Sequence, residues 1–399
     1  MKIVLAYSGG LDTSVAIKWL HEKGHEVVTF TAEIGQNENL NKIKEKAENL
    51  GATAYALDLR EEFVEDYVSP AIRANALYEG IYPLATALAR PLIAKYLVEI
   101  AKKENASAVA HGCTGKGNDK VRFDVTINAL DENLKIISPM VEWGMSRDEE
   151  IKYAKEHNIP VKSTSKSPYS IDENLWGRSA ECGILEHPEC EPPEDAYEWT
   201  TKPENAPDKA EYMEIGYEKG IPVSINSENL NKIQLVVNLN KIAGKHGIGR
   251  LDHVEDRIVG LKSREIYEAP AAVLLINAHN DLQKYVSTIH ENLFRKMVED
   301  KWAYMVYAGL WMDPLRKELE AFINKANEKV TGNVRVKLYK GNFMIVGRES
   351  KNGLYDLNLA TYDKGSLFNE RASDGFIELW GLQSRMFNKI HGEMMKNQK

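Results

Sequence analysis

The chain has 399 residues, of which 51 are basic and 59 acidic, so its formal net charge is −8. That length predicts two or three domains with a large core, and the acidic balance argues against a dedicated nucleic-acid-binding protein. Three cysteines are too few for a disulfide framework and favour a reducing compartment. We expect a cytoplasmic protein, because no apolar run is long enough for a bilayer and the first strand leaves no room for a signal peptide.

The first notable segment lies near the N-terminus, between a predicted strand and a predicted helix. Residues 3–6 are uniformly apolar and predict a buried strand, while residues 15–20 carry an apolar stripe at helical spacing. Between them, residues 7–14 read Tyr-Ser-Gly-Gly-Leu-Asp-Thr-Ser, and we call them the phosphate loop. Its two glycines allow a ligand to approach the backbone, and the helix start offers N–H groups and a partial positive charge to an anion.

The phosphate loop lacks the motifs of two common nucleotide sites. No Gly-Lys-Ser or Gly-Lys-Thr occurs in the chain, so this is no Walker loop, and Thr13 stands where a dinucleotide fingerprint has its third glycine. Its one carboxylate, Asp12, would repel phosphates unless a cation lay between them, so we expect Mg²⁺ there. Gly9 and Gly10 alone could form an ordinary turn, but the whole string resembles the pyrophosphate loop of the N-type ATP pyrophosphatases, which cleave ATP between its α and β phosphates.

Strand and helix patterns alternate through the rest of the first sixty or so residues. We expect a strand at residues 26–32, a helix at residues 40–50 and a further strand at residues 54–59. This order predicts a parallel sheet with right-handed crossovers, which places ligands at the carboxyl ends of the strands. Ala32 ends the second strand and could flank an adenine, although plain packing explains an alanine there. Residues 61–105 read as helices broken by a turn, in which Tyr82 is by itself an ordinary packed residue.

A second glycine-rich segment follows the next predicted strand, residues 107–111. We call residues 112–122 the substrate loop; they lead into a helix expected to open near residue 120. Its donors and acceptors suit a zwitterionic amino acid, whose carboxylate needs donors and whose ammonium group needs acceptors. A flexible surface loop is the alternative, but a strand end beside the phosphate loop favours a binding site. The polar side chains concerned are those of Thr114, Asn118, Asp119 and Arg122.

Longer stretches of the chain resemble the argininosuccinate synthase family. The likeness combines both loops with segments at residues 168–175, 244–250, 254–257 and 260–268, and it covers essentially the whole chain. Members of that family use ATP to join citrulline to aspartate and release AMP and pyrophosphate. The resemblance implies an AMP-forming carbon–nitrogen ligase of arginine biosynthesis that works through a citrullyl-adenylate. It implies citrulline, aspartate and ATP as partners, a homotetramer, and neither nucleic acid nor membrane as a partner.

The resemblance also assigns site residues, position by position. It places Asp12 in catalysis, near Mg²⁺. It places ATP against Ala6, Tyr7, Ser8, Gly9, Gly10, Leu11, Asp12, Thr13, Ser14, Ala32 and Gly112. It places aspartate against Thr114, Asn118 and Asp119, and citrulline against Tyr82, Asn118, Arg122, Ser170, Ser179, Glu255 and Tyr267. One position departs from the family: Ala87 stands where many members have a serine, so that hydroxyl contact is lost or Thr86 replaces it.

The remaining patterns suggest the domain organisation. Ser146, with an acidic residue three places on, predicts a capped helix that completes the first domain. Residues 163–209 contain several prolines and little periodicity, which predicts a boundary and a long ordered loop. A zinc site there would lack a fourth ligand beside Cys182, His187 and Cys190. Four helices and a hairpin follow, at residues 231–243, 269–285, 291–308, 314–329 and 334–348.

We therefore expect an α/β protein with a parallel, doubly wound sheet, followed by an α+β domain and a helical tail. The predicted boundaries are a nucleotide-binding domain at residues 1–165, a synthetase domain at 166–362 and a C-terminal oligomerisation tail at 363–399. The tail is too apolar for a solvated arm, as Leu379 and Trp380 show, which favours docking on a partner subunit. Docking on its own chain is nearly as consistent with the sequence.

Two other functions remain open at this stage. A tRNA-thiolating pyrophosphatase would share the phosphate loop, but it would need a catalytic cysteine pair and a basic face for RNA. The acidic net charge argues against such a face. A non-catalytic nucleotide sensor would keep the glycines and leave Asp12 and the substrate loop without a role. Release of AMP that depends on aspartate distinguishes the three.

Overall fold

The computed structural model describes residues 1–36, 39–160 and 169–396. The chain forms two compact units, Met1–Asn352 and Gly353–Lys399, which are considered separately. The predicted boundary between residues 165 and 166 lies outside the described residues, and the division at 362 stays a prediction. Within the described ranges, no helix is long and apolar enough to cross a membrane.

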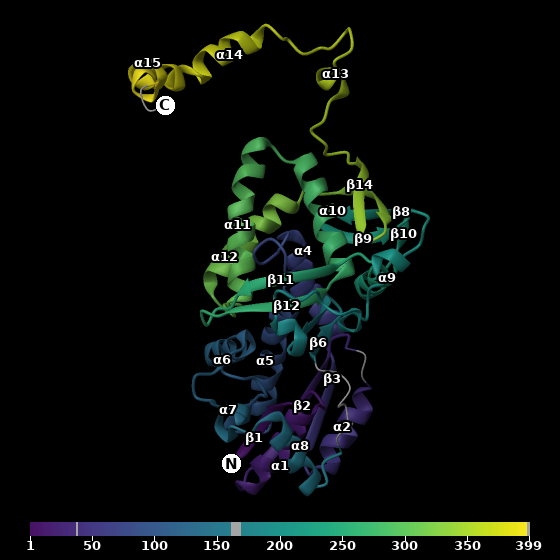
Figure 1. Ribbon diagram of the computed structural model, residues 1–399, viewed down its shortest axis with the longest axis vertical. Helices are drawn as coiled ribbons and strands as arrows, with labels where there is room; N and C mark the ends of the chain where they lie inside the picture. Colours follow the sequence, from purple (N-terminus) through teal and green to yellow (C-terminus); the bar gives the residue numbers. More distant parts are fainter. Residues whose placement is uncertain (37–38, 161–168, 397–399) are drawn as a thin grey trace. The chain divides into compact units, whose positions relative to one another are not determined.

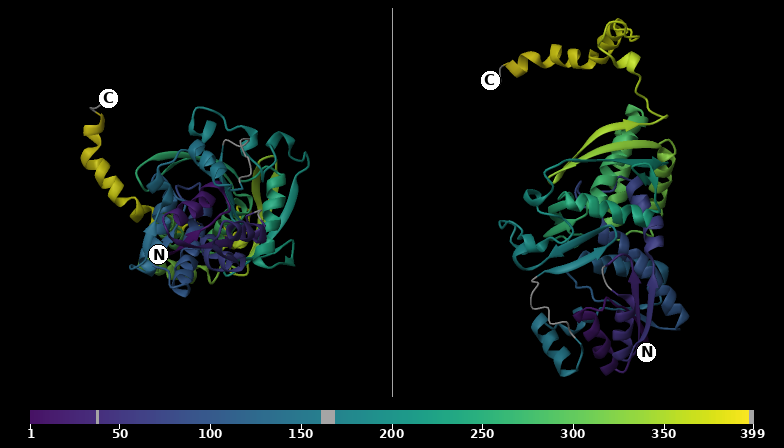
Figure 2. Two further views of the ribbon diagram at one scale, coloured as in Figure 1. Left: turned by 90° about the horizontal axis from the view of Figure 1, so that it is seen from below. Right: turned by 90° about the vertical axis from the view of Figure 1, so that its right-hand side faces the viewer.

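Unit 1 contains the predicted parallel sheet, at the end of the unit that carries the N-terminus (Figures 1 and 2). The strand order is β3-β2-β1-β4-β5, and every pairing is parallel. The order reverses between β1 and β4, so the segments that follow these two strands lie at the switch point, where open α/β sheets bind ligands. The strands are β1 (Lys2–Ala6), β2 (Glu26–Glu33), β3 (Thr53–Asp58), β4 (Ala108–Ala110) and β5 (Lys135–Ile137).

Helices cover both faces of this sheet because its strands are apolar on both sides. Ile3 and Leu5 pack with residues of α1 and α2, whereas Val4 belongs to the cluster that includes α5. The sheet is therefore doubly wound, as predicted. The helices of this region are α1 (Leu11–Glu22), α2 (Leu40–Asn49), α3 (Arg60–Glu62), a π-helix (Phe63–Val68), α4 (Ser69–Arg73), α5 (Ala85–Lys103), α6 (Asn118–Leu130), α7 (Pro139–Trp143) and α8 (Arg147–Glu156).

A four-stranded antiparallel sheet corrects one prediction. Residues 163–209 were expected to form a long loop, but two strands lie within them, β6 (Ser170–Asn174) and β7 (Gly177–Glu181), together with three 3₁₀ turns. Both strands are rich in polar residues, and Arg178 and Ser179 are buried. No apolar alternation marks them in the sequence, because one face of this sheet turns polar side chains into the molecule. The order is β11-β12-β7-β6, with β11 (Arg250–Asp256) and β12 (Lys262–Glu268).

The other antiparallel sheet and four helices complete unit 1, and the predicted hairpin is confirmed as β13 and β14. Asn231 caps α9 by accepting from the Gln234 N–H, as expected, and Ser146 forms a capping box with Glu149 on α8. The sheet order is β10-β9-β8-β13-β14. The elements are β8 (Glu211–Glu218), β9 (Ile221–Ile225), β10 (Glu228–Asn229), α9 (Lys232–Lys245), α10 (Pro270–Val286), α11 (Ile289–Tyr307), α12 (Pro314–Asn327), β13 (Gly332–Tyr339) and β14 (Asn342–Glu349).

Unit 2 is helical, as predicted, and consists of α13 (Leu357–Ala360), α14 (Ala372–Trp380) and α15 (Leu382–Lys396). None of its side chains is buried among those that the structure describes. The Phe376 and Trp380 rings stack with centroids 5.3 Å apart, yet both side chains remain exposed. This unit therefore has no core of its own.

Candidate active site

The phosphate loop joins β1, which ends at Ala6, to α1, which begins at Leu11. Hydroxyl groups fix its shape: Ser14 Oγ donates to the Gly10 carbonyl at 2.6 Å, and Ser8 Oγ lies 3.2 Å from Thr13 Oγ1. No side chain among the described residues caps α1 at Gly10. The first N–H groups of α1 therefore stay available to an anionic ligand.

Two cations reach this loop from other helices, although the loop itself has none. Lys46 of α2 donates to the Gly9 carbonyl at 2.6 Å, and Arg147 of α8 lies 2.7 Å from an oxygen of Asp12. Neither contact could be predicted from local sequence, although Ser146 predicted where α8 starts. One turn further along α8, Glu150 is 2% exposed, and its burial and the neighbouring Asp12 carboxylate raise its pKa to about 8. Cations and carboxyl groups therefore both lie close to the phosphate loop.

The substrate loop lies against the phosphate loop, as its place at the switch point predicts. A Cβ atom added to Gly112 would lie 3.2 Å from the Thr13 side chain, so the two loops are in contact there. Behind this contact, His111 is buried, with Nε2 2.7 Å from Asp124 and Nδ1 accepting from the Cys113 N–H at 3.3 Å. His111 therefore anchors the start of the substrate loop. Thr114 is exposed, and helix α6 begins at Asn118 rather than near residue 120.

A buried polar cluster forms where α6, β11, β12 and the end of α11 meet. Asn118 Nδ2 donates to the Tyr307 hydroxyl at 2.8 Å, and that hydroxyl donates to Glu255 at 2.7 Å. The Tyr267 hydroxyl donates to the other oxygen of Glu255 at 2.7 Å, and the ring of Tyr82 stacks on Tyr267 at 4.2 Å. Burial raises the pKa of Tyr82 to about 12, so it stays protonated. Sequence reasoning missed Tyr307, because nothing local distinguishes it from the other apolar positions of α11.

Arg122 is the cation of this cluster and is only 3% exposed. Its Nε donates to the Tyr307 carbonyl at 3.0 Å, and its Nη1 donates to Asp119 at 2.8 Å and to Thr86 Oγ1 at 3.3 Å. Its Nη2 is buried and has no partner among the described residues. A buried guanidinium nitrogen without an acceptor is costly, so it marks a place for a ligand oxygen. Thr86 Oγ1 also lies 2.7 Å from the Tyr82 hydroxyl.

Asp119 lies between two arginines. Arg90 Nε donates to it at 2.9 Å from one side, and Arg122 donates from the other. Burial by itself raises the pKa of Asp119, but the charges of Arg90 and Arg122 outweigh it and lower the pKa to about 2. Arg90, which the sequence did not single out, also pairs with Asp172 on β6. Asp119 is thus held as a carboxylate, and Arg90 links it to Asp172 of the four-stranded sheet.

Four of the predicted citrulline residues lie on one face of that sheet. Asp172 pairs with Ser179, and Ser179 pairs with Tyr267 across β7 and β12. Side chains two apart on a strand share a face, which adds Ser170 on β6 and, through β12, Glu255 on β11. Ser179 is buried, whereas Ser170 is exposed at the edge. The register therefore gathers the predicted citrulline residues that are far apart in sequence.

A glycine after α11 permits the closest approach in the cluster. Gly309 has a φ of +75°, and a Cβ there would lie 2.8 Å from Arg122 Cα. Only glycine combines this left-handed backbone with such a contact. It lets the end of α11 bring Tyr307 against Arg122.

A parallel α/β sheet with an anion-binding loop at its switch point defines a nucleotide-binding protein. In this chain, the elements β11, β12 and α11 add a buried polar cluster next to that sheet. Two family models match the chain: the arginosuccinate synthase N-terminal HUP domain over residues 2–160 and the arginosuccinate synthase C-terminal domain over residues 169–387. The chain belongs to the argininosuccinate synthase family.

Curated relatives agree with the family models. The argininosuccinate synthase of Pyrococcus furiosus is 56% identical over 98% of this chain and 96% of its own length. That of Dictyoglomus thermophilum is 58% identical over 97% of both chains, and that of Listeria welshimeri is 53% identical over 98% of both. Among solved structures, a 4-thiouridine synthetase–RNA complex with bound ATP matches at 18% identity over 39% of this chain and 40% of that one, with a TM-score of 0.30. A likeness at that score has no bearing on function.

Proposed function

We propose that the chain is an ATP-dependent ligase that condenses citrulline with aspartate to argininosuccinate, through a citrullyl-adenylate, and releases AMP and pyrophosphate. The observation that carries the proposal is the buried Arg122, whose Nη2 has no acceptor in the part of the chain that the structure describes and which belongs to the loop that contacts the phosphate loop. A guanidinium in this setting suits the carboxylate of an amino-acid substrate. The ATP, aspartate and citrulline residues assigned above by resemblance are part of this proposal.

In the first step, the ureido oxygen of citrulline attacks the α-phosphorus of ATP, and the bond from that phosphorus to the bridging oxygen breaks. Pyrophosphate leaves with the bonding electrons, and the N–H groups that open α1 stabilise its charge. Lys46 and Arg147 add positive charge at the loop. Arg122, Tyr82 and the Glu255 cluster hold citrulline so that its oxygen faces the phosphorus.

In the second step, the amine of aspartate attacks the activated carbon of the citrullyl group. A carbon–nitrogen bond forms, the carbon–oxygen bond to AMP breaks, and the amine loses a proton. Thr114, Asn118 and Asp119 are proposed to hold aspartate, and the low pKa of Asp119 keeps it an acceptor for the ammonium group at any physiological pH. The contact between the two loops at Gly112 and Thr13 supports this step, because it brings the residues proposed to hold aspartate next to those proposed to hold ATP.

Mg²⁺ is part of the proposal. Proteins usually hold this ion with one or two carboxylates and the phosphates of the substrate, and Asp12, which is 38% exposed, offers such a carboxylate at the loop. When bound, the ion would neutralise charge on the leaving pyrophosphate. Arg147 holds the Asp12 carboxylate in place by an ion pair.

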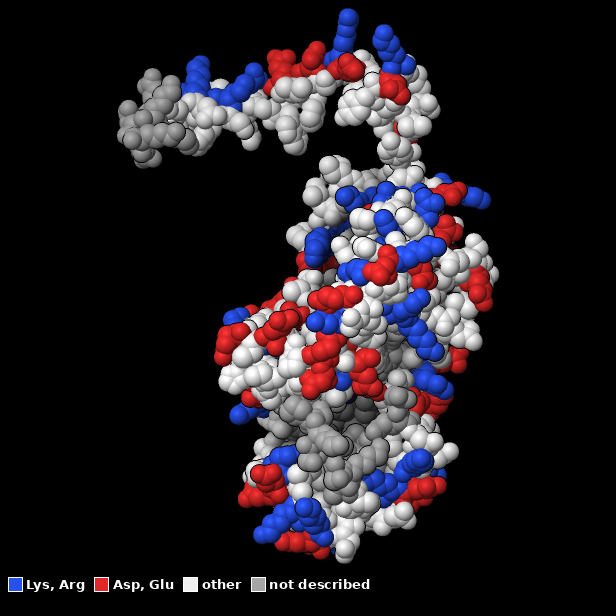
Figure 3. Space-filling model, turned by 45° about the vertical axis from the view of Figure 1, so that its right-hand side comes forward, with Lys and Arg blue, Asp and Glu red and all other residues white. Residues whose placement is uncertain are grey.

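The tRNA-thiolating alternative is not favoured. The family models and relatives cover nearly the whole chain, including the part that carries the polar cluster. On the face shown in Figure 3, basic and acidic side chains are interspersed rather than gathered into one basic surface. Cys113, Cys182 and Cys190 are free thiols, which fits a reducing compartment such as the cytoplasm.

Isotope transfer tests the proposed reaction. Heavy oxygen placed in the ureido group of citrulline is expected to appear in AMP and not in pyrophosphate, because that oxygen becomes bonded to the α-phosphorus. Mass spectrometry of the nucleotide and phosphate products measures this. Label in inorganic phosphate, or ADP as the stoichiometric product, would show that citrulline is phosphorylated instead, and the proposal would be wrong.

We also propose a homotetramer in which unit 2 docks on a partner subunit, with the domains divided at residues 165 and 362. Phe376, Leu379 and Trp380 are 60% to 79% exposed, and the unit has no core, so it needs a surface to cover it. Deleting residues 376–399 is expected to lower the oligomeric state, measured as molar mass by light scattering. An unchanged mass would mean that these helices do not hold the subunits together.

A further inference from the structure

Just beyond the end of β1, the edge of β2 is not paired with another strand among the described residues, although the Ile34 carbonyl accepts from the Leu175 N–H at 2.9 Å. The last β1 pairing joins Ala6 to Phe30, and the Tyr7 N–H donates to the Phe30 carbonyl. Along a strand, successive residues turn their N–H and C=O groups to opposite sides. The Glu33 carbonyl faces β3, where it accepts from the Leu59 N–H at 2.9 Å. The Ala32 carbonyl and the Ile34 N–H therefore face the other side, toward the phosphate loop.

The carboxamide of Gln36 covers this edge. Its Nε2 donates to the Ala32 carbonyl at 2.5 Å, and its Oε1 accepts from the Ile34 N–H at 2.9 Å. Because the backbone offers one acceptor and one donor, only one orientation of the amide satisfies both. A planar group with a donor and an acceptor side by side thus occupies the strand edge that leads to the phosphate loop.

Adenine presents the same pattern on its six-membered ring. Its N6 amino group donates and its N1 accepts, so the base fits a backbone carbonyl and an N–H in the way that the Gln36 amide does. Hypoxanthine reverses the pattern, because its O6 accepts and its N1–H donates. The Ala32–Ile34 edge therefore discriminates between the two bases by hydrogen bonding.

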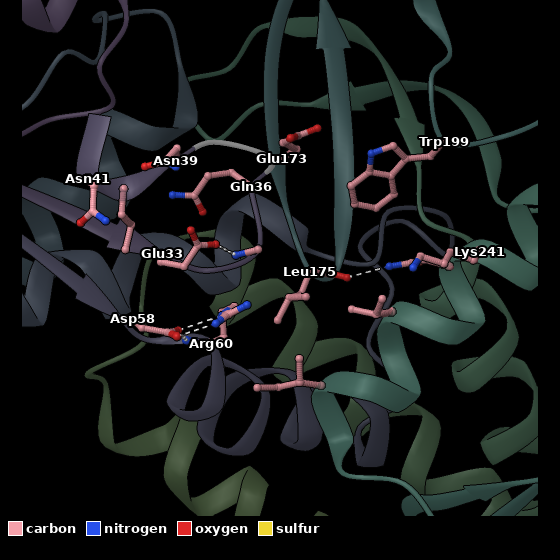
Figure 4. Close-up of a pocket in the computed structure, with 15 residues that line it drawn as sticks. Glu33, Gln36, Asn39, Asn41, Asp58, Arg60, Glu173, Leu175, Trp199 and Lys241 are labelled. Atoms are coloured by element: carbon pink, nitrogen blue, oxygen red, sulfur yellow. Dashed lines mark hydrogen bonds and ion pairs between the residues drawn. The ribbon is translucent and has the colours of Figure 1, made fainter. Parts of the chain in front are cut away.

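We propose that the Gln36 side chain is an internal stand-in for adenine, which competes with ATP for the Ala32–Ile34 edge and turns away when the nucleotide binds. This inference rests on the proposed use of ATP. A cavity of about 950 Å³ adjoins Gln36 and gives its side chain room to move. Polar groups of Glu33, Asn39 and Lys241 line this cavity and offer new partners to the displaced amide (Figure 4).

The competition lowers the apparent affinity for ATP. A ligand that needs this edge binds only to the molecules in which the edge is vacant. Its apparent Kd is the intrinsic Kd divided by the fraction of such molecules. Two backbone hydrogen bonds of ordinary strength leave the edge vacant in a minority of molecules, so removing the amide should tighten ATP binding about fivefold. Tripolyphosphate has no base and reaches only the phosphate loop, so its affinity should not change.

Calorimetric titration of the full chain with ATP, ITP and tripolyphosphate tests this. Gln36→Ala removes the amide. Gln36→Glu keeps the length but, when ionised, cannot donate to the Ala32 carbonyl, so it too should release the edge. Asn41→Ala is the matched control, because Asn41 lines the same cavity and is exposed. Thermal unfolding confirms that each variant is folded.

The expected result is a several-fold lower Kd for ATP in both Gln36 variants, with tripolyphosphate binding unchanged and the Asn41 variant like the wild type. ITP should bind more weakly than ATP throughout. An ATP Kd that is unchanged or higher in both variants overturns the inference, as does an equal gain for tripolyphosphate, which would locate the effect at the phosphates. Failure of the wild type to bind ATP would instead overturn the proposed function and this inference with it.

Discussion

Asp12→Asn is expected to lower kcat by about 100- to 1,000-fold, the range seen when one preorganised electrostatic group is removed from an active site. The carboxylate lies at the phosphate loop, which has no lysine of its own, and it is the group proposed to share Mg²⁺ with the phosphates. Its loss also leaves Arg147 without its partner at 2.7 Å. Initial rates of AMP release at several Mg²⁺ concentrations measure the effect.

Stability should change little in this variant. Asp12 and Arg147 are 38% and 62% exposed, and ion pairs in contact with solvent contribute about 1 kcal/mol or less. Asp58→Asn is the matched control, because Asp58, at the end of β3, also pairs with an arginine, Arg60, at 2.6 Å. That variant should keep its activity. Full activity of Asp12→Asn at ordinary Mg²⁺ would remove Asp12 from the mechanism.

Arg122→Lys is expected to raise the citrulline KM about 10- to 100-fold, because a charge-assisted hydrogen bond to a carboxylate contributes roughly 1.5–3 kcal/mol. The guanidinium donates to the Tyr307 carbonyl and to Asp119, and its Nη2 has no partner within the described ranges. An ammonium group is a single point and cannot reach all three positions at once. The ATP KM should stay within about threefold, because Arg122 donates to none of the phosphate-loop residues in the contacts described above.

Arg264→Lys serves as the control for a buried arginine that pairs with a carboxylate elsewhere. Its side chain is 5% exposed and contacts both oxygens of Asp252, at 2.8 and 2.6 Å. This variant reports the cost to stability of losing an arginine fork, with no expected change in the citrulline KM. Steady-state kinetics with each substrate varied in turn measure both variants. An unchanged citrulline KM in Arg122→Lys would exclude Arg122 from that site.

The sequence determined the features that depend on neighbouring residues. Apolar runs specified the parallel strands, since burial on both faces requires them. Ser146 with Glu149 and Asn231 marked helix starts, because a capping side chain bonds to N–H groups two or three residues away. The phosphate loop was recognisable because its glycines and hydroxyls act within one turn of chain.

Features that depend on packing were decided only by the tertiary structure. Tyr307 bonds to Asn118, 189 positions away, and Arg147 reaches Asp12 across 135 positions. The strands β6 and β7 were missed because polar residues occupy both of them, buried on β7 and largely exposed or half-buried on β6, so the apolar alternation that marks a strand is absent. Gln36 looks like an ordinary loop residue until the fold shows that β1 ends beside Ala32. Such contacts form because distant segments are brought together by the core, and no local pattern encodes them.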